Sequence, residues 1–414
     1  MSQIKEFPEA DLQQWSDRLR RELKAPHTIE SLQWQASEFF KLDPLYDANI
    51  LSSENLEYLK TFHNQWKAHK IKERPDILAF ADLIAGDVSQ IKLAEGYHLQ
   101  SWYSENYMSE VFSLPISTRN LSPNQSQFEG FSEFDPLMNG LAIGKWNSVD
   151  FKNMAEQNIH IHAADVHNAG GSAVQELATT LLAAEAYKIQ LEGNVDWTNS
   201  AVIHLGIGPL FWIELAKVRA MRLLFINFCH VNGLTVKAGN IRTETSKLYW
   251  SKTDSELNLI RHTSEVMSSI FGGADQILVF PHTFEKEKAL DATRLAINIP
   301  LLAFEESQLH TQFDPASGSY MLEILTHKLA QSAWKLFSEW NGIGFEKMVK
   351  ENRLQNEIGK SAQLLKNRFR DGEVQIVGVN SFQSPMAKTS PAFPVYAPIE
   401  NPDFQPLVPV FLDV

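Results

Sequence analysis

The chain has 414 residues, of which 44% are hydrophobic and 11% aromatic, and its formal net charge at pH 7 is -13. This length and hydrophobic share predict a folded protein with a sizeable core, in one large domain or two to three ordinary ones. The acidic balance argues against nucleic acid or an anionic membrane as a partner. A single cysteine, Cys229, rules out an intramolecular disulfide and a thiolate metal cluster.

No targeting or membrane segment is expected. Residues 1–15 lack the apolar core of a signal peptide. The most apolar long stretch, residues 201–228, is interrupted by four charges that exclude a membrane span and are expected to form intrahelical pairs or an interface: Glu214, Lys217, Arg219 and Arg222. The sequence therefore predicts a cytoplasmic protein.

The first predicted element is a helix over residues 10–23, because apolar residues recur there at helical spacing. The residues that follow, up to about 50, are irregular in pattern. Residues 1–50 are therefore predicted to form an N-terminal arm that packs on the main domain or on a partner chain.

From about residue 158, short β-rich runs alternate with long helical patterns. The runs begin 33 to 42 residues apart, which is typical of βα units with a parallel sheet: IHIHAA (159–164), AVIHLGI (201–207), LTVKAG (234–239) and QILVFP (276–281). A doubly wound sheet and a (β/α)8 barrel both fit, and the length before residue 158 favours the barrel. We therefore predict an α/β fold with a (β/α)8 TIM barrel over residues 51–370 and an extended, proline-rich C-terminal tail over 371–414.

One short motif, DVHNAGG (165–171), contains the pattern D-x-H-x-x-G, whose histidine ligates cobalt in many cobalamin-binding domains. That signature also needs a serine about forty residues later and then a glycine pair. The corresponding windows here read LFWIEL and AGNIRTE, which contain neither. The motif is therefore interpreted as a βα turn built on Asn168 and the glycines.

Several longer stretches resemble the methylmalonyl-CoA mutase family. They are residues 158–193, 202–225, 242–283 and 292–334, together with the PLY element at 44–46. The resemblance implies a (β/α)8 barrel that threads an acyl-CoA along its axis, and a separate C-terminal domain that holds adenosylcobalamin. In this family, homolysis of the cobalt–carbon bond starts the rearrangement of methylmalonyl-CoA to succinyl-CoA, while the protein positions the substrate and excludes water.

The chain departs from the catalytic members of this family at the positions that matter most. Their Tyr-His pair falls on Ala164 and Asp165, so no catalytic residue is expected, because a carboxylate would repel an acidic substrate. Their aromatic, arginine-rich segment has no recognisable counterpart in residues 49–76. By contrast, TSKLYWSKTD, GGADQILVFP and VGVNSF resemble the non-catalytic small subunit.

Two histidines are expected to fill the barrel interior. Period-two alternation places His160 and His162 on one face of their strand, where catalytic members have small hydroxyl residues. We therefore predict a plugged barrel, in which these two residues, with His167 and Arg242, mark a vestigial substrate site. A histidine pair at this spacing also suits zinc or nickel. No third ligand stands at an obvious spacing, so no metal site is predicted.

Together these features predict a small, non-catalytic subunit of adenosylcobalamin-dependent methylmalonyl-CoA mutase, an isomerase. No cofactor is expected on this chain, because no cobalamin domain follows VGVNSF (377–382). Adenosylcobalamin is expected on a large-subunit partner, around which the arm and the tail would wrap. Two alternatives remain open: the barrel chain of a split acyl-CoA mutase with cobalamin on a separate chain, and a non-enzymatic, acyl-CoA-binding homodimer.

Overall fold

The structure is a computed structural model. It describes residues 11–24, 26–47, 135–144, 159–191, 196–235, 240–252, 254–283, 285, 288–312, 314–385, 403–407 and 409–412, and the backbone of the strands between residues 76 and 132. Within these residues, no helix is both long enough and apolar enough to cross a bilayer.

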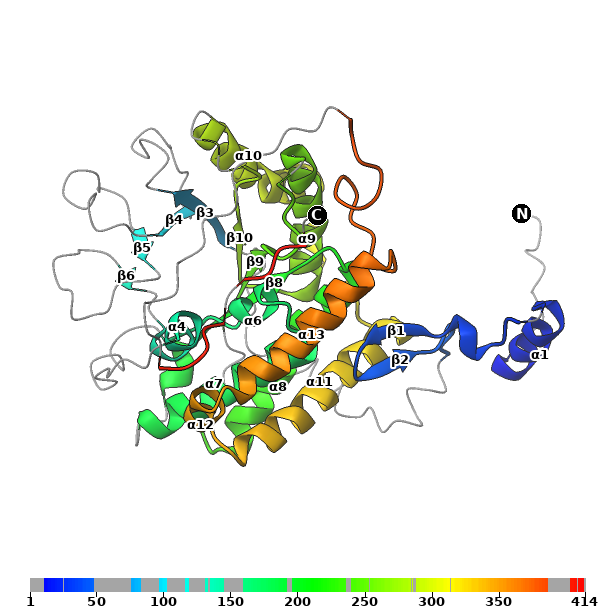
Figure 1. Ribbon diagram of the computed structural model, residues 1–414, viewed down its shortest axis with the longest axis horizontal. Coiled ribbons are helices and arrows are strands. Elements are labelled where there is room, and N and C mark those ends of the chain that lie inside the picture. The colour runs from blue at the N-terminus through cyan, green and yellow to red at the C-terminus, as the bar shows by residue number, and fades with distance from the viewer. Residues whose placement is uncertain are drawn as a thin grey trace.

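A parallel sheet forms the centre of the molecule (Figure 1). Its strands are β3 (Asp76–Asp82), β4 (Tyr97–Trp102), β5 (Ile116–Thr118), β6 (Phe131–Ser132), β7 (His160–Ile161), β8 (Val202–Ile207), β9 (Asn240–Thr245) and β10 (Gln276–Val279). They pair in the order β6-β5-β4-β3-β10-β9-β8-β7, and every pair is parallel. Consecutive strands are neighbours and the last strand pairs with the first. Among the described residues, β6 and β7 are not paired with each other.

Helices and short turns connect and cover these strands. The α-helices after β6 are α4 (Pro136–Ile143), α6 (Ala164–Asn168), α7 (Ala173–Gln190), α8 (Phe211–Val231), α9 (Ser255–Gly272), α10 (Ala289–Leu301), α11 (Tyr320–Asn341), α12 (Phe345–Lys350) and α13 (Arg353–Arg370). Shorter turns are η3 (Trp197–Asn199), η5 (Leu302–Glu306) and η6 (Leu309–Thr311). The predicted α/β class with a parallel sheet is confirmed, whereas closure into a TIM barrel remains a prediction.

The strands predicted at 159–164, 201–207 and 276–281 are found as β7, β8 and β10. β7 is shorter than IHIHAA, because residues 164–168 wind into α6. Of the strand expected at 234–239, residues 236–239 lie outside the described residues, and the described strand β9 spans Asn240–Thr245. Leu234 instead belongs to the end of α8: its N–H donates to the carbonyl of Cys229, and Gly233 takes a positive φ of 64°. Capping of the helix therefore uses the residues that the β-rich pattern assigned to a strand.

In β7 to β9, one face of the sheet is apolar and most side chains of the other face are polar. Alternate residues of β7 to β10, such as Ile161, Ile203 and Ile241, belong to the main hydrophobic core together with residues of the covering helices. The residues between them, such as His204 and Arg242, point to the opposite face, because side chains alternate along a strand. Burial of the apolar side chains under the helices therefore also determines which side chains meet on the opposite face of the sheet.

The covering helices begin and pack as their sequences predict. α7 starts at a capping box, in which the Ser172 hydroxyl accepts from the Gln175 N–H and the Gln175 side chain accepts from the Ser172 N–H. α7 and α8 are buried around most of their circumference and both pack against α11. Figure 1 shows α11 and α13 as long helices on one side of the molecule.

The arm contains a helix and a hairpin that differ in their contacts. α1 (Leu12–Glu22) follows the predicted helix closely, has no buried residue and lies apart from the body in Figure 1. After the turn η1 (Glu30–Leu32), the antiparallel strands β1 (Trp34–Ser37) and β2 (Phe40–Leu42) join the core. There the Ser361 hydroxyl donates to Glu38 at 2.8 Å. The hairpin is thus anchored on α13, whereas α1 has no such anchor.

The described part of the tail folds back on its own chain. The N–H groups of Phe404 and Leu407 donate to carbonyls at the end of α4, and the Val410 N–H donates to the carbonyl of Asn168. Phe404, Leu407 and Leu412 are buried. These contacts hold the tail against the loop that contains DVHNAGG, and not away from the body as a free segment.

The charges of α8 connect different elements. Lys217 does pair within the helix, with Glu214 at 2.6 Å, as expected. Arg219 instead reaches Asp314 and Glu323, and Arg222 reaches Asp275 at the start of β10. The expectation of intrahelical pairs or an interface is therefore wrong for both arginines, because sequence spacing does not reveal partners on other elements.

Replacing Arg219 by Met is expected to lower the free energy of unfolding by about 3–5 kcal/mol, because two buried carboxylates lose their partner. Lys350→Met removes a surface ion pair with Glu346 and should change the free energy of unfolding by less than about 0.5 kcal/mol. Urea unfolding of both variants measures the difference. Equal effects would contradict a structural role for the Arg219 cluster.

Candidate functional site

A line of hydrogen bonds crosses the polar face of the sheet from β7 to β9. His160 Nδ1 lies 2.8 Å from His204 Nε2, and His204 Nδ1 lies 2.8 Å from Glu244 Oε1. His160 stands opposite Val202 in the ladder and His204 opposite Arg242, so each bond steps two residues along the strands. Since a carboxylate only accepts, His204 Nδ1 carries a hydrogen, and in the neutral ring its Nε2 accepts from His160.

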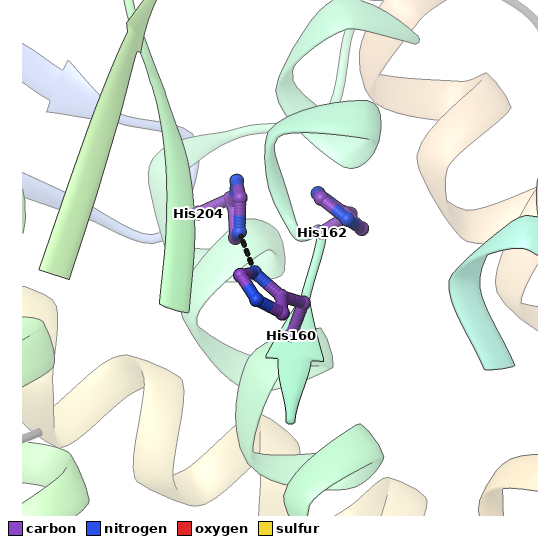
Figure 2. A group of neighbouring side chains, drawn as sticks. All are labelled: His160, His162 and His204. Atoms are coloured by element: carbon purple, nitrogen blue, oxygen red, sulfur yellow. Dashed lines mark hydrogen bonds between the residues drawn. The ribbon is translucent and has the colours of Figure 1, made fainter. Parts of the chain in front are cut away.

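His162 completes a cluster of three imidazoles (Figure 2). Its ring centroid lies 3.9 Å from that of His204 and 5.9 Å from that of His160. One nitrogen from each ring lies within 4.8 Å of the other two, and all three residues are buried. Three side chains of the type that binds zinc and nickel therefore converge at one point of the sheet.

His204 is the residue that sequence reasoning missed. The prediction of no metal site relied on the lack of a third ligand at an obvious spacing in the sequence, whereas the structure places His204 beside His160 and His162. The signal was present in AVIHLGI: consecutive βα units place their strands side by side, and alternation puts one histidine of that run on the same face. A search for ligands along one strand does not see a neighbour across the sheet.

Arg242 lies on the same face but is engaged with the next strand. Its Nε donates to Gln276 Oε1 at 2.7 Å, on the β10 side of β9. Of the four predicted vestigial-site residues, His160, His162 and Arg242 thus share one face of the sheet. Their contact with a substrate remains a prediction.

Ala164 and Asp165 occupy the first turn of α6, directly after β7. Ala164 is completely buried, and Asp165 is partly buried. The N–H of Asp165 donates to the carbonyl of His162. The positions that the resemblance assigns to a catalytic Tyr-His pair thus carry a methyl group and a carboxylate, so this turn offers no phenol or imidazole.

The glycines of DVHNAGG allow a close approach to α13. Gly170 has a φ of 86°, and a Cβ at this position would lie 2.7 Å from that of Ala362. Asn168 closes the turn from the other side, since its Oδ1 accepts from the Lys247 N–H at 3.0 Å. The predicted βα turn is thus found only around Gly170, because residues 165–168 belong to α6.

His167 is packed inside the protein. Its Nε2 lies 2.8 Å from the Ser246 hydroxyl, and its ring covers Gly206. Burial, reinforced by the charge of Lys217, holds the pKa of His167 well below its usual value. This residue is therefore a neutral imidazole at physiological pH, and it lies apart from the cluster of three histidines.

A buried cluster of acidic and basic side chains contacts the backbone of β8 at Gly206. Glu176 accepts from the Gly206 N–H and from Lys217 Nζ, both at 2.7 Å, and Lys217 also pairs with Glu214. Burial raises the pKa of Glu176 to about 7, and the second carboxylate adds to this effect. Burial alone would lower the pKa of Lys217, but the two carboxylates outweigh it and raise that pKa. Lys217 thus pairs with two carboxylates at once.

Asp135 holds the backbone of His162, a member of the cluster of three histidines. Its Oδ1 accepts from the Tyr187 hydroxyl at 2.7 Å, and its Oδ2 accepts from the His162 N–H at 2.8 Å. The same carboxylate caps α4 by accepting from Leu137 and Met138. Burial raises the pKa of Asp135 to about 6. The backbone of His162 is therefore held by a rigid, enclosed group.

Parallel strands joined by helices, with polar side chains on one face of β7 to β9, define an α/β protein built from repeated βα units. A family model described as methylmalonyl-CoA mutase matches residues 142–401. The chain therefore belongs to the methylmalonyl-CoA mutase family.

Curated relatives agree with this assignment. The chain is 25% identical over 431 residues to the methylmalonyl-CoA mutase small subunit of Porphyromonas gingivalis, a match that covers 86% of this chain and 67% of that protein. A "Probable methylmalonyl-CoA mutase small subunit" of Mycobacterium bovis is 32% identical over 227 residues, with 52% and 37% covered. Human mitochondrial methylmalonyl-CoA mutase is 31% identical over 247 residues, with 56% and 32% covered. The predicted resemblance to this family and its small subunits is confirmed.

Replacing Gly206 by Ala is expected to lower the free energy of unfolding by about 1–3 kcal/mol, because its Cβ would meet the His167 ring at 2.7 Å. Gly359 in α13 has open space around it, so Gly359→Ala should instead raise it by up to about 1 kcal/mol. Urea unfolding of the two variants checks both signs. Stabilisation by Gly206→Ala would mean that the His167 ring does not lie over Gly206.

The raised pKa of Glu176 predicts a pH dependence of stability. Between about pH 4.5 and 7 the folded protein binds a proton that the unfolded chain has lost, so stability falls as pH rises through this window. Glu176→Gln removes that loss, so the variant should gain stability relative to wild type between pH 5 and pH 8. Urea unfolding at both pH values measures it, with the exposed Glu346→Gln as control. A difference independent of pH would contradict the assignment.

Proposed function

We propose that this chain is a non-catalytic small subunit of an adenosylcobalamin-dependent methylmalonyl-CoA mutase. The isomerase activity would then belong to the complex with a large subunit. The observation that carries this proposal is the filled polar face: His160, His162 and His204 occupy it where catalytic relatives are expected to leave room for a substrate. Ala164 and Asp165, which take the place of the Tyr-His pair, support the same conclusion.

The proposal includes a closed barrel. β10 pairs with β3, and consecutive strands are neighbours on both sides of that pair. This circular order is that of a (β/α)8 barrel with a seam between β6 and β7. In such a barrel the polar face is the interior, so the three imidazoles would stand on the axis along which an acyl-CoA would otherwise pass. Inward histidines in place of small hydroxyl residues explain why this barrel would not bind substrate there.

Cobalamin is expected on the partner, because the described residues of DVHNAGG do not fit it. The histidine of D-x-H-x-x-G is His167, whose Nε2 is 2.8 Å from Ser246 and whose ring is packed over Gly206. To bind cobalt, the His167 imidazole would have to leave this buried position. We therefore derive no chemical step on this chain through the cofactor.

The arm supplies a surface for the large subunit. α1 carries Leu12, Trp15 and Leu19 at helical spacing, yet none of its residues is buried against the chain's own core. An amphipathic helix of this kind is stabilised when its apolar side packs against another protein. The β1–β2 hairpin anchors this arm to α13, and α1 would extend from the anchor to the partner.

Co-expression with a cobalamin-binding methylmalonyl-CoA mutase large subunit tests the proposal. The two chains should co-elute in a fixed ratio. Deletion of residues 1–24 should weaken co-elution, because it removes the helix proposed to contact the large subunit. The deletion should not unfold this chain, because α1 contributes no buried residue to its core. The chain alone should leave the visible spectrum of adenosylcobalamin unchanged and show no mutase turnover.

Two results would contradict this role. A base-off cobalamin spectrum from the chain alone, abolished by His167→Ala, would make DVHNAGG a cobalt site. Mutase turnover with a separate cobalamin-binding chain would instead establish a split enzyme. A homodimer that binds acyl-CoA and ignores the large subunit would likewise replace the proposal with a binding module.

A further inference from the structure

Three buried histidines, on β7, directly after β7 and on the adjacent strand β8, present nitrogens to one another (Figure 2). We propose that His160, His162 and His204 form a binding site for a divalent transition-metal ion, with zinc as the metal that suits them best. This inference goes beyond the role of a small subunit and does not depend on it, because only the geometry of this cluster carries it.

The spacing of the nitrogens suits a single ion. Zinc binds histidine nitrogen at about 2.0–2.1 Å in tetrahedral geometry, which places two such nitrogens about 3.4 Å apart. Here His160 Nδ1 and His204 Nε2 are 2.8 Å apart, and no pair of ligand nitrogens exceeds 4.8 Å. A bound ion would therefore push the first two rings slightly apart, while the His162 nitrogen lies near enough to reach the same ion by rotation of its ring.

Glu244 supplies the outer partner that metal-binding histidines ordinarily have. Its carboxylate accepts from His204 Nδ1 at 2.8 Å, and both side chains are fully buried. That bond fixes the tautomer in which Nε2, the nitrogen that faces the cluster, has its lone pair available. A carboxylate in this position also raises the basicity of the imidazole, and hence its strength as a ligand.

The backbone around the cluster is already fixed. Asp135 Oδ2 accepts from the His162 N–H at 2.8 Å, while His160 and His204 belong to paired strands. Ligands held on strands and by buried hydrogen bonds lose little freedom when a metal binds. The site therefore needs small rotations of the imidazole rings and a shift of the His160 hydrogen from Nδ1 to Nε2, but no rearrangement of the chain.

The charges around the three histidines affect their affinity for a metal ion. A dication bound by three neutral imidazoles requires a negative neighbour, and Glu244 provides one charge. Arg242 lies on the same face and opposes a cation, but its Nε is bound to Gln276 on the side of β9 away from His204. Water or hydroxide would occupy the fourth coordination position.

The ion would act as a clamp between β7 and β8. β7 has only two residues in its ladder and, among the described strands, pairs with β8 alone. A metal shared by His160, His162 and His204 would hold this short strand in register. Zinc-bound protein should accordingly be more stable than the metal-free chain, because the ion binds only the folded state tightly.

The test uses the full chain without a polyhistidine tag, stripped with a chelator and then titrated with Zn²⁺ by calorimetry. One zinc ion per chain is expected. Co²⁺ used as a probe should give the visible absorption of a tetrahedral site. His204→Ala should abolish stoichiometric binding, and Glu244→Gln, which keeps every ligand, should weaken it by about 10–100-fold.

A second buried histidine–glutamate pair provides the matched control. His262 Nδ1 lies 2.8 Å from Glu265 Oε2 in α9, and neither residue belongs to the cluster. His262→Ala and Glu265→Gln should leave zinc stoichiometry and affinity unchanged.

Absence of stoichiometric zinc and cobalt binding by the wild-type chain would overturn the proposal. So would an equal loss of binding in the control variants. Where His204→Ala does not fold, the wild-type cobalt spectrum and Glu244→Gln still decide the question.

Discussion

Alternation of side chains along β7 to β10 is the constraint from which the other features follow. One set of residues, represented by Ile161, Ile203 and Ile241, must be buried under the helices, since this is where the main hydrophobic core lies. Each strand is thereby fixed in rotation about its own axis. The remaining set has to share the opposite face, and this brings His160, His204 and Glu244 into contact although 84 residues separate the first from the last.

Three buried cations of helix α8 connect the sheet to the neighbouring helices. Lys217 holds Glu176 against Gly206 on β8, Arg219 reaches Glu323 on α11, and Arg222 reaches Asp275 before β10. Each cation is buried and paired, because an isolated charge in this interior would be very costly. The apolar appearance of α8 in the sequence and its three buried cations therefore have one explanation: the helix lies between the sheet and α11, where apolar and ion-paired side chains are both enclosed.

The family assignment and the polar face together define what is distinctive about this chain. Similarity to methylmalonyl-CoA mutases and their small subunits extends over most of the barrel-like part. Yet the face on which catalytic relatives are expected to hold substrate here carries imidazoles that bond to one another and to a carboxylate. Function depends on the site and not on the fold, so shared architecture is compatible with loss of catalysis. A metal-binding cluster would give this polar face a structural role.

The sequence by itself determined the α/β class, the repeated βα units, the family and the placement of His160 and His162 on one strand face. These features are encoded locally, in the period of apolar residues and in contiguous motifs. It also identified the α1 helix and a turn at DVHNAGG, for which Gly170 and Asn168 carry local signals. The use of Leu234 at the end of α8 was missed, because this residue begins a β-rich run in the sequence.

Only the tertiary structure decided how distant residues meet. His204 joins the other two histidines because strand pairing sets β8 beside β7, and no spacing along one strand contains that information. The partners of Arg219 and Arg222 likewise lie on elements up to about a hundred residues away, where helix periodicity gives no signal. Long-range contacts depend on which faces pack together, and that choice is made by the burial of the whole core and not by any single segment.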